Sequence, residues 1–448
     1  MQFIKFKKFF NARRSFCMSI GFIGIIAVSF IYSTGLASNP IRSDGLGYYM
    51  YLPAFFIYKD ISLSEKAEEF DGGKFPIEYG IKHIESTDSH LIKYPCGIAL
   101  LMLPFFLLSH AFSLVFQLEI TGFEIQYQIG AISSGLFYFI IGLSFLWKFL
   151  ANYFRVEIIL ISLIAIVFGS NLFHYGTYDL IFSHIYSFFL FSLFLYLVNR
   201  QYYRHLSDKW DIFIGLVIGL IIVTRPTNIL WLILGILYGV SSSDSFRIRM
   251  ELYISQWKKA LWILISAASI ISIQMLYWKE VTGHVIYYSY QHEGFDFLNP
   301  QVVNVLFSPH KGLFFWSPIL FIGTFGLMFS RSMQPSIWLA SILFLVANIY
   351  VIASWETWWY GGSFGHRAFI ESTPLFAFGL CFVFDNLFRH RHGMLVLIPV
   401  TFCVFWTSWH MIAYWLHIIP FDHATLSDVA ISLDYFISCM GLIQLILI

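Results

Sequence analysis

The feature that most constrains this chain is the recurrence of long apolar runs from one end of the sequence to the other. An α-helix needs about 20 consecutive apolar residues to cross the hydrocarbon core of a bilayer. Hydrophobic residues make up 58% of the chain and charged residues only 12%, so little polar sequence remains for a soluble domain. The sequence therefore predicts an all-α, polytopic transmembrane protein.

Charge and cysteine content exclude several other classes. The net charge of +1 gives no reason to expect nucleic acid as a partner. The 5 cysteines include no Cys-x-x-Cys pair, so we expect neither a disulfide framework nor a zinc site of that kind. The basic N-terminus precedes an apolar run that resembles a cleaved signal peptide, but the many later runs favour an uncleaved signal anchor.

Lysines and arginines gather between the apolar runs. The clusters are at residues 5–14, 148–155, 200–209, 247–259, 331 and 389–391. The positive-inside rule places these segments in the cytoplasm together with the N-terminus. An even number of crossings must then separate each pair of clusters.

This parity bears first on the runs at residues 16–36, 95–116 and 127–147. Three crossings there would leave Lys148 outside, so one of the three runs is not a span. The middle run opens with Lys93-Tyr94-Pro95 and contains Pro104. We expect it to be a helix that lies on the outer membrane surface or dips into it. A true span with a weak charge bias is the alternative.

Parity bears next on the apolar stretch 210–240, which is about 30 residues or ~45 Å of helix. It is interrupted at Thr224-Arg225-Pro226. We expect two short helices that form a hairpin with Arg225 at its tip, in the outer half of the membrane. A charge at that depth has a partner or a substrate, so a structural ion pair with another helix is the alternative.

The other spans are expected near residues 156–172, 183–199, 260–278, 312–330, 336–354, 373–388 and 394–413. The total is about eleven crossings, and the tail 435–448 is too short to cross. We expect one transmembrane domain over residues 1–448, with no soluble C-terminal domain. Residues 37–124 form its first external loop, with juxtamembrane helices.

Asp44 follows the first span and is succeeded at once by aromatic and apolar residues. A carboxylate where bilayer meets water can act as a general base on a lipid-borne substrate. The alternative is a helix cap, because Ser43 and Asp44 are both good N-cap residues.

The predicted external face collects the other candidate site residues. They are Lys93, Tyr94, Tyr178, Asp179, Arg225, His292, Glu293, Lys311, His366 and Arg367. Arg225, Lys311 and Arg367 come from three segments and could bind one phosphate or pyrophosphate. A catalytic metal is the weaker interpretation: the chain has no Asp-x-Asp pair, and His292 with Glu293, or His366, would have to meet Asp44. We therefore expect no metal and no cofactor.

Several short motifs resemble those of the GT-C superfamily of membrane glycosyltransferases, particularly the branch of protein O-mannosyltransferases and aminoarabinose transferases. They are the acidic Asp44 after the first span, Lys93-Tyr94-Pro95, Thr224-Arg225-Pro226 and the late Gly365-His366-Arg367. The resemblance implies a GT-C-like core and an enzyme that transfers one sugar, with inversion, from a polyprenyl-phosphate donor. The acceptor would be a lipid, glycan or protein on the external face of a bacterial inner membrane.

By the same resemblance, Asp44 matches the catalytic acidic position and Arg225 a lysine that meets the donor phosphate. Lys93 and Arg367 match basic residues at the juxtamembrane helix and late in the core. Many relatives have an Asp-Glu pair where this chain has Asp44-Gly45, so a second carboxylate would come from Glu293 or Asp179. A transporter or flippase of a lipid-linked or anionic solute, a surface-polysaccharide polymerase or ligase, and a membrane scaffold are the alternative functions.

Overall fold

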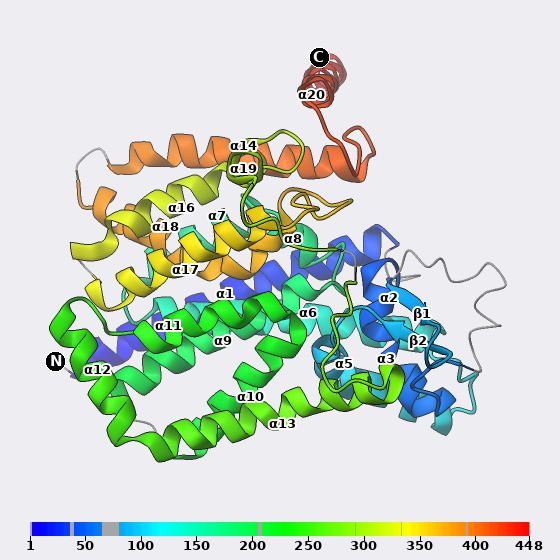
Figure 1. The fold of residues 1–448 in the computed structure, drawn as a ribbon. Coiled ribbons are helices and arrows are strands. Elements are labelled where there is room, and N and C mark those ends of the chain that lie inside the picture. The colour runs from blue at the N-terminus through cyan, green and yellow to red at the C-terminus, as the bar shows by residue number, and fades with distance from the viewer. Residues whose placement is uncertain are drawn as a thin grey trace. The chain divides into compact units, whose positions relative to one another are not determined.

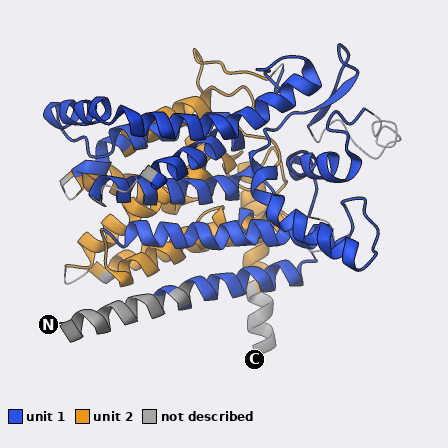
Figure 2. Cartoon of the chain, turned by 90° about the horizontal axis from the view of Figure 1, so that it is seen from below, with its two compact units in different colours: residues 1–152, 175–292, 335–340 blue, residues 153–174, 293–334, 341–448 orange. Residues whose placement is uncertain are grey.

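The structure is a computed structural model that describes residues 2–35, 40–64, 80–204, 208–291, 293–332, 334–390 and 393–447. The protein is mostly helical, with 72% helix and 3% strand. By its internal contacts the chain divides into two compact units (Figure 2). Unit 1 holds residues 1–152, 175–292 and 335–340, and unit 2 holds residues 153–174, 293–334 and 341–448.

Unit 1 combines long helices with one small β-hairpin (Figure 1). Its α-helices are α1 (Gln2–Ser33), α2 (Asp44–Tyr49), α3 (Tyr51–Pro53), α5 (Gly97–Val115), α6 (Ile125–Leu150), α9 (Ser183–Arg204), α10 (Asp208–Thr224), α11 (Leu232–Leu237), α12 (Ser243–Ser255) and α13 (Trp257–Thr282). Its other elements are the π-helix η2 (Ala54–Tyr58), the 3-10 helix η4 (Pro226–Trp231), and the strands β1 (Ile81–Ile84) and β2 (Ser89–Ile92).

Unit 2 is built from helices joined by loops. Its α-helices are α7 (Val156–Phe168), α8 (Leu172–Tyr175), α14 (Val302–Phe307), α15 (Leu313–Trp316), α16 (Pro318–Phe329), α17 (Pro335–Ser354), α18 (Thr373–Leu387), α19 (Leu397–Trp415) and α20 (Leu426–Leu447). Its 3-10 helices are η5 (Ser330–Ser332), η6 (Arg367–Ser372) and η7 (Gly393–Val396). The start of α17 belongs to unit 1, as does the last residue of α8.

Within the described residues, six helical segments are long and apolar enough to cross a membrane, judged by length and composition. They are α5, α6, α13, α17, the joined stretch Arg367–Leu387, and α19. Four shorter apolar helices lie at Ile20–Ser33, Val156–Phe168, Pro226–Leu237 and Pro318–Phe329. The predicted multi-pass helical character is confirmed at this level, whereas the number of eleven crossings stays a prediction.

The last helix is longer than the sequence indicated. α20 begins at Leu426, ahead of the apolar tail predicted at 435–448. Its start is fixed by Thr425, whose amide and hydroxyl both donate to the Asp428 carboxylate at 2.8 and 2.7 Å. These hydrogen bonds at the N-terminus stabilise the helix start. The helix therefore includes residues 426–434, which precede the apolar run that hydropathy identifies.

The helix break predicted within residues 210–240 is present. α10 ends at Thr224, Arg225 is extended with φ −151° and ψ 121°, and η4 begins at Pro226. α10 runs antiparallel to α9, so that Arg225, just after the end of α10, lies beside His184 at the start of α9. The chain then returns, because Tyr238 is hydrogen-bonded to Asn199 near the end of α9. Arg225 therefore sits at the tip of a helical hairpin, as expected.

Helix α5 lies alongside only the first half of α6. The Tyr138 hydroxyl donates to the Leu101 carbonyl, and the Ser109 hydroxyl donates to the Gln126 carbonyl, each at 2.9 Å. The contact continues to Ser113, whose hydroxyl accepts a hydrogen bond of 2.9 Å from the Gln126 side chain. α5 is long enough to span, and its placement on or across the membrane stays a prediction.

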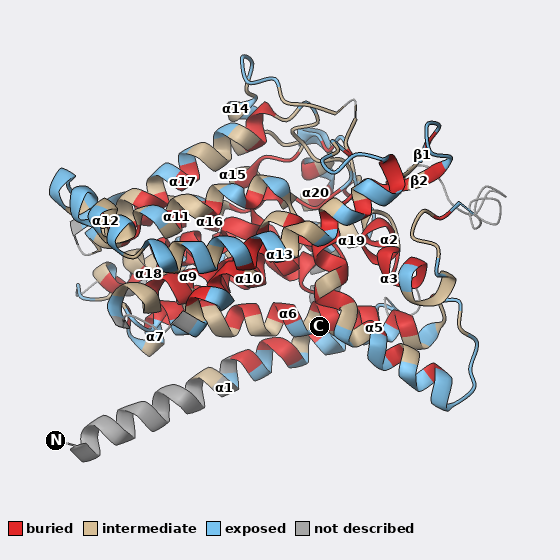
Figure 3. Ribbon diagram, turned by 60° about the horizontal axis from the view of Figure 1, so that its bottom comes forward, coloured by how far each residue is buried: buried red, intermediate tan, exposed pale blue. Residues whose placement is uncertain are grey.

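Glycines let helices pack backbone to backbone inside each unit. In unit 1 a Cβ on Gly219 of α10 would lie 2.8 Å from the Ala267 carbonyl of α13. In unit 2 a Cβ on Gly323 of α16 would lie 2.6 Å from the Phe376 carbonyl of α18. Small residues allow this close approach in membrane helices. Along α13, many apolar residues stay exposed (Figure 3), as lipid-facing side chains would be.

The described part of the first loop contains a hairpin that the sequence analysis missed. β1 and β2 pair antiparallel, with Ile81 opposite Ile92. The turn places Asp88 at φ 50°, and the hydroxyl of the neighbouring Thr87 donates to the Val281 carbonyl at 2.6 Å. A hairpin this short depends on such tertiary contacts, which the sequence does not display.

The two ends of unit 1 differ in composition. The helix α12 lies at one end, while α2, α3 and the β1–β2 hairpin lie at the other (Figures 1 and 3). α12 carries Arg247 and Arg249 from a predicted cytoplasmic cluster, and α2 begins with Asp44. The orientation of these two ends in a membrane stays a prediction.

Candidate functional site

Asp44 is the first residue of α2, and the N-cap position belongs to Ser43. Ser43 has φ 50° and ψ −138°, and its side chain makes no capping hydrogen bond. The alternative that Asp44 is the N-cap is therefore wrong. A non-glycine residue held in such a backbone region costs of the order of 1–3 kcal/mol, and residues of this kind cluster at functional sites.

Tyr94 contacts Asp44 directly. The Tyr94 hydroxyl donates a hydrogen bond of 2.8 Å to the Asp44 Oδ1 atom. Burial, and then the charge of Asp44, raise the pKa of Tyr94 well above its ordinary range, so this hydroxyl remains a donor. The Tyr94 backbone carbonyl accepts a bond of 2.7 Å from Tyr51, and the Tyr48 ring lies 4.5 Å from the Tyr94 ring.

The segment before α5 is fixed by hydrogen bonds from two other parts of unit 1. The Ile92 amide donates to the Tyr277 hydroxyl (2.7 Å), the Cys96 amide to Gln274 Oε1 (2.7 Å), and the Ser289 hydroxyl to the Lys93 carbonyl (2.6 Å). The Lys93 ammonium lies 4.7 Å from the ring centre of Tyr290 and 5.8 Å from that of Tyr94. Cation–π contacts thus hold Lys93 beside the residue that contacts Asp44.

Arg225 lies close to the same segment. A Cβ on Gly97, at the start of α5, would lie 2.5 Å from the Thr224 amide nitrogen. The backbone at the helix break therefore touches the backbone at the start of α5. The Arg225 Nη1 atom lies 3.3 Å from the His184 Nδ1 atom. Asp44, Lys93 and Arg225 are thus linked through a short series of contacts within unit 1.

A second ion pair lies beside α2. The Arg42 Nη2 atom is 3.4 Å from the Asp179 Oδ1 atom, and the Arg42 guanidinium carbon lies 4.8 Å from the ring centre of Tyr178. Tyr178 and Asp179 are thus both near α2, as candidate site residues should be. Arg42 was not among the candidates, although its position two residues before Asp44 was a usable signal.

The backbone at Gly45 leaves little room for a larger residue. A Cβ at this position would lie 3.1 and 3.2 Å from the Ile181 Cγ2 and Cβ atoms. That spacing is tighter than ordinary van der Waals contact, so a glutamate would need Ile181 to move. α2 therefore packs closely on residues 181–182.

Lys311 belongs to unit 2, in the loop before α15. Its buried ammonium donates to the carbonyls of Ser363 and Phe421 at 2.5 and 2.6 Å. Burial lowers the pKa of Lys311 to about 7, an effect that the Asp422 carboxylate opposes and Arg367 reinforces. Lys311 therefore ties three loops together, and Arg367 is near enough to influence it.

His366 and Glu293 are the other described candidates of unit 2. His366 is buried, with its ring 5.7 Å from the Tyr360 ring and 4.9 Å from the Phe369 ring. Glu293 is partly exposed, at the start of an extended segment. His292 lies outside the described residues. Convergence of the unit 1 and unit 2 candidates on one substrate stays a prediction.

One group of side chains in the described part of the chain has the spacing of metal ligands. It consists of His310, Asp422 and His423 of unit 2, whose ligand atoms all lie within 4.8 Å of one another. None of these residues was among the candidates. The sequence signal was weak, since His310 and the Asp422-His423 pair are more than a hundred residues apart.

No protein-family model, no curated protein and no solved structure matches this chain.

Proposed function

We propose that this chain is a membrane glycosyltransferase that moves a sugar from a polyprenyl-phosphate donor to an acceptor hydroxyl, with Asp44 as the general base. The observation that carries the proposal is the 2.8 Å contact of Tyr94 with Asp44, beside the positive charge of Lys93. The backbone contact of Gly97 with Thr224 brings the Arg225 segment to the same region. The motif resemblance supplies the reaction class.

In the proposed reaction the Asp44 carboxylate takes the proton of the acceptor hydroxyl as its oxygen attacks the anomeric carbon. The bond from that carbon to the phosphate oxygen breaks, and polyprenyl phosphate leaves with the electron pair. Lys93 and Arg225 stabilise the negative charge that develops on the phosphate. Attack from the side opposite the leaving group inverts the anomeric configuration.

We assign the base role to Asp44 because its carboxylate accepts the Tyr94 hydrogen bond, whereas the Asp179 carboxylate is engaged by the Arg42 guanidinium. In this scheme Asp179 and Tyr178 hold Arg42 and shape the site without taking the proton.

The remaining parts of the proposal come from sequence. The chain crosses the membrane about eleven times, with its N-terminus in the cytoplasm of a bacterial cell and the site on the external face of the inner membrane. Arg367 is the better phosphate ligand in unit 2, because two donors of Lys311 are already directed at carbonyls. Glu293 and His366 would contact the sugar or the acceptor.

The test uses the purified full-length protein with radiolabelled polyprenyl-phosphate sugars and separate lipid, glycan and protein acceptor fractions. We expect acceptor-dependent release of polyprenyl phosphate, and a decrease of roughly 10²–10⁴-fold for Asp44→Asn. Asp60→Asn is the matched control, because it changes a carboxylate of the same loop, one that accepts hydrogen bonds from the amide and hydroxyl of Ser62. Full activity of Asp44→Asn, with a normal melting temperature, would remove Asp44 from the mechanism.

A transporter or flippase is the second candidate, because transporters use interrupted helices in two matching halves. Unit 1 has its break at Arg225, between a long helix and η4. Unit 2 has a break at Ser317, but α15 before it is only one turn long. The two breaks are thus not equivalent. Movement of the lipid-linked sugar across proteoliposomes without its consumption would favour this candidate over the transferase.

A further inference from the structure

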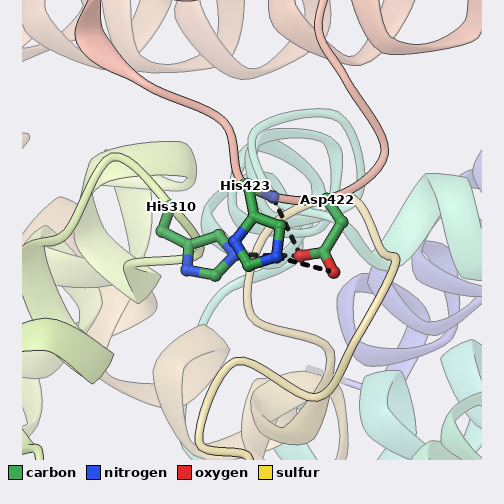
Figure 4. Close-up of side chains that lie close together, drawn as sticks. All are labelled: His310, Asp422 and His423. Atoms are coloured by element: carbon green, nitrogen blue, oxygen red, sulfur yellow. Dashed lines mark hydrogen bonds and ion pairs between the residues drawn. The ribbon is translucent and has the colours of Figure 1, made fainter.

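Two loops of unit 2 bring together three side chains that the proposed transfer reaction does not use. His310 precedes α15, and Asp422 and His423 lie between α19 and α20 (Figure 4). The His310 Nε2 atom is 2.9 Å from Asp422 Oδ1, and the His423 Nε2 atom is 3.7 Å from Asp422 Oδ2. The two imidazole rings are stacked with centroids 4.9 Å apart.

The surroundings hold His310 and Asp422 in place. The side chains of His310 and Asp422 are only 17% and 24% exposed. The His310 ring packs against the rings of Trp358 and Trp359 at 5.5 and 5.6 Å. His310 is thus oriented by packing before any ligand arrives.

His423 adopts an unfavourable backbone conformation at the position where its ring lies beside His310 and Asp422. His423 has φ 54°, a left-handed conformation that non-glycine residues rarely adopt. Its amide donates to Asp422 Oδ1 at 2.9 Å. Its side chain is 76% exposed, so its ring can turn without disturbing the core.

Asp422 is suited to be the anionic member of the group. Its Oδ1 atom lies 2.9 Å from the His310 Nε2 atom and accepts a hydrogen bond of 2.9 Å from the His423 amide. The nearby Lys311 ammonium is directed at the carbonyls of Ser363 and Phe421. The carboxylate oxygens therefore face the two imidazoles.

We propose that His310, Asp422 and His423 bind a divalent transition-metal ion of the zinc class, which fastens the loop before α15 to the loop between α19 and α20. Two imidazoles and one carboxylate form an open three-ligand set for zinc, with the fourth position left for water. Tetrahedral zinc places its ligand atoms about 3.3 Å apart. The ligand atoms here lie within 4.8 Å, so a small rotation of His423 completes the site.

A hydrogen-bonded His-Asp-His group without metal is the competing explanation. It needs only an acceptor at position 422 and gains nothing from His423 as a ligand. Asp422→Asn separates the two, because an asparagine carbonyl still accepts a hydrogen bond from His310 but offers no anionic ligand. The metal explanation predicts a loss of binding for this variant.

The test uses full-length protein in detergent, stripped with a chelator and then equilibrated with zinc alone. Bound metal is measured by equilibrium dialysis with elemental analysis, and cobalt provides an absorption spectrum that reports tetrahedral geometry. We expect about one zinc per chain and at least roughly tenfold weaker binding for His423→Ala and Asp422→Asn. His417→Ala is the matched control, because His417 is an exposed histidine of the same loop and has φ 57°.

A second measurement does not depend on stoichiometry. Zinc should raise the melting temperature of the wild type and of His417→Ala, but not that of His423→Ala. Equal zinc affinity of His423→Ala and the wild type would overturn the proposal. So would equal weakening by His417→Ala, which would indicate scattered surface histidines. These measurements need no transferase activity, so they stand apart from the proposed function.

Discussion

The hydroxyl of Tyr94 donates a 2.8 Å hydrogen bond to the carboxylate of Asp44, across fifty residues of sequence. The backbone of Tyr94 is in turn held by the Tyr51 hydroxyl. The position of the proposed base thus depends on the turn that opens α5. Catalytic efficiency in such a site requires the base to be held within a fraction of an ångström of its working position.

Tyr94→Phe should therefore lower the rate of sugar transfer. The variant keeps the ring and its packing but removes the hydrogen bond, which contributes about 1 kcal/mol to stability and more to orientation. We expect a rate decrease of about tenfold, measured as acceptor-dependent release of polyprenyl phosphate. Tyr58→Phe, which removes a 2.7 Å bond to the Thr121 carbonyl, is the control. Equal rates for the two variants would contradict the positioning role.

Ser43→Gly should be more stable than Ser43→Ala. Both variants lack the hydroxyl, so their difference isolates the backbone at φ 50° and ψ −138°. Glycine adopts this region without the roughly 1–3 kcal/mol penalty. The greater conformational entropy of glycine in the unfolded state reduces this gain by about 0.5–1 kcal/mol. We expect a net advantage of about 1 kcal/mol for Ser43→Gly by thermal unfolding in detergent. A lower melting temperature for Ser43→Gly would show that Ser43 is not strained.

Gly45→Ala should destabilise the protein, whereas the same substitution at Gly21 should not. The new Cβ would lie 3.1 Å from the Ile181 Cγ2 atom, and overpacking costs about 1–3 kcal/mol. Gly21→Ala in α1 is the control, because no atom lies within 4 Å of its added Cβ and alanine favours helix. Ile181→Ala should recover part of the loss in a double variant. Additive effects would mean that the two positions do not touch.

Lys311→Met should destabilise unit 2 strongly. The buried ammonium satisfies the Ser363 and Phe421 carbonyls, and an unsatisfied buried acceptor costs about 1–3 kcal/mol. Lys279→Met is the matched control, since the Lys279 ammonium donates to the Gly283 carbonyl at an exposed site. We expect a clear decrease in melting temperature for Lys311→Met alone. Normal stability together with weak donor binding would instead favour a direct phosphate contact by Lys311.

Hydropathy and charge predicted those parts of the fold that depend on local sequence. The break at Arg225 follows from a proline and from a run too long for one span, and both signals are local. α7, α9 and α13 overlap their predicted spans for the same reason. The β1–β2 hairpin was missed because its support comes from Tyr277 and Val281, which are far away in sequence.

The candidate site was predicted one residue at a time, without its contacts. Asp44 and Tyr94 were both named, but no sequence pattern relates residues fifty positions apart to a hydrogen bond. Arg42 was missed because an arginine near a first span has many ordinary explanations. The His310–Asp422–His423 group was missed because metal ligands are recognised in sequence by short spacings, and here two distant loops contribute.

The contact of Gly97 with the Thr224 backbone has a mechanical consequence. Two main chains that meet without an intervening side chain have no compressible layer between them, because interiors are packed as densely as crystals. A displacement of the first turn of α5 must therefore be passed to the tip of the α10–α11 hairpin. If a ligand displaces α5, the backbone at Arg225 should move with it, so the proposed base and the proposed phosphate ligand would shift together.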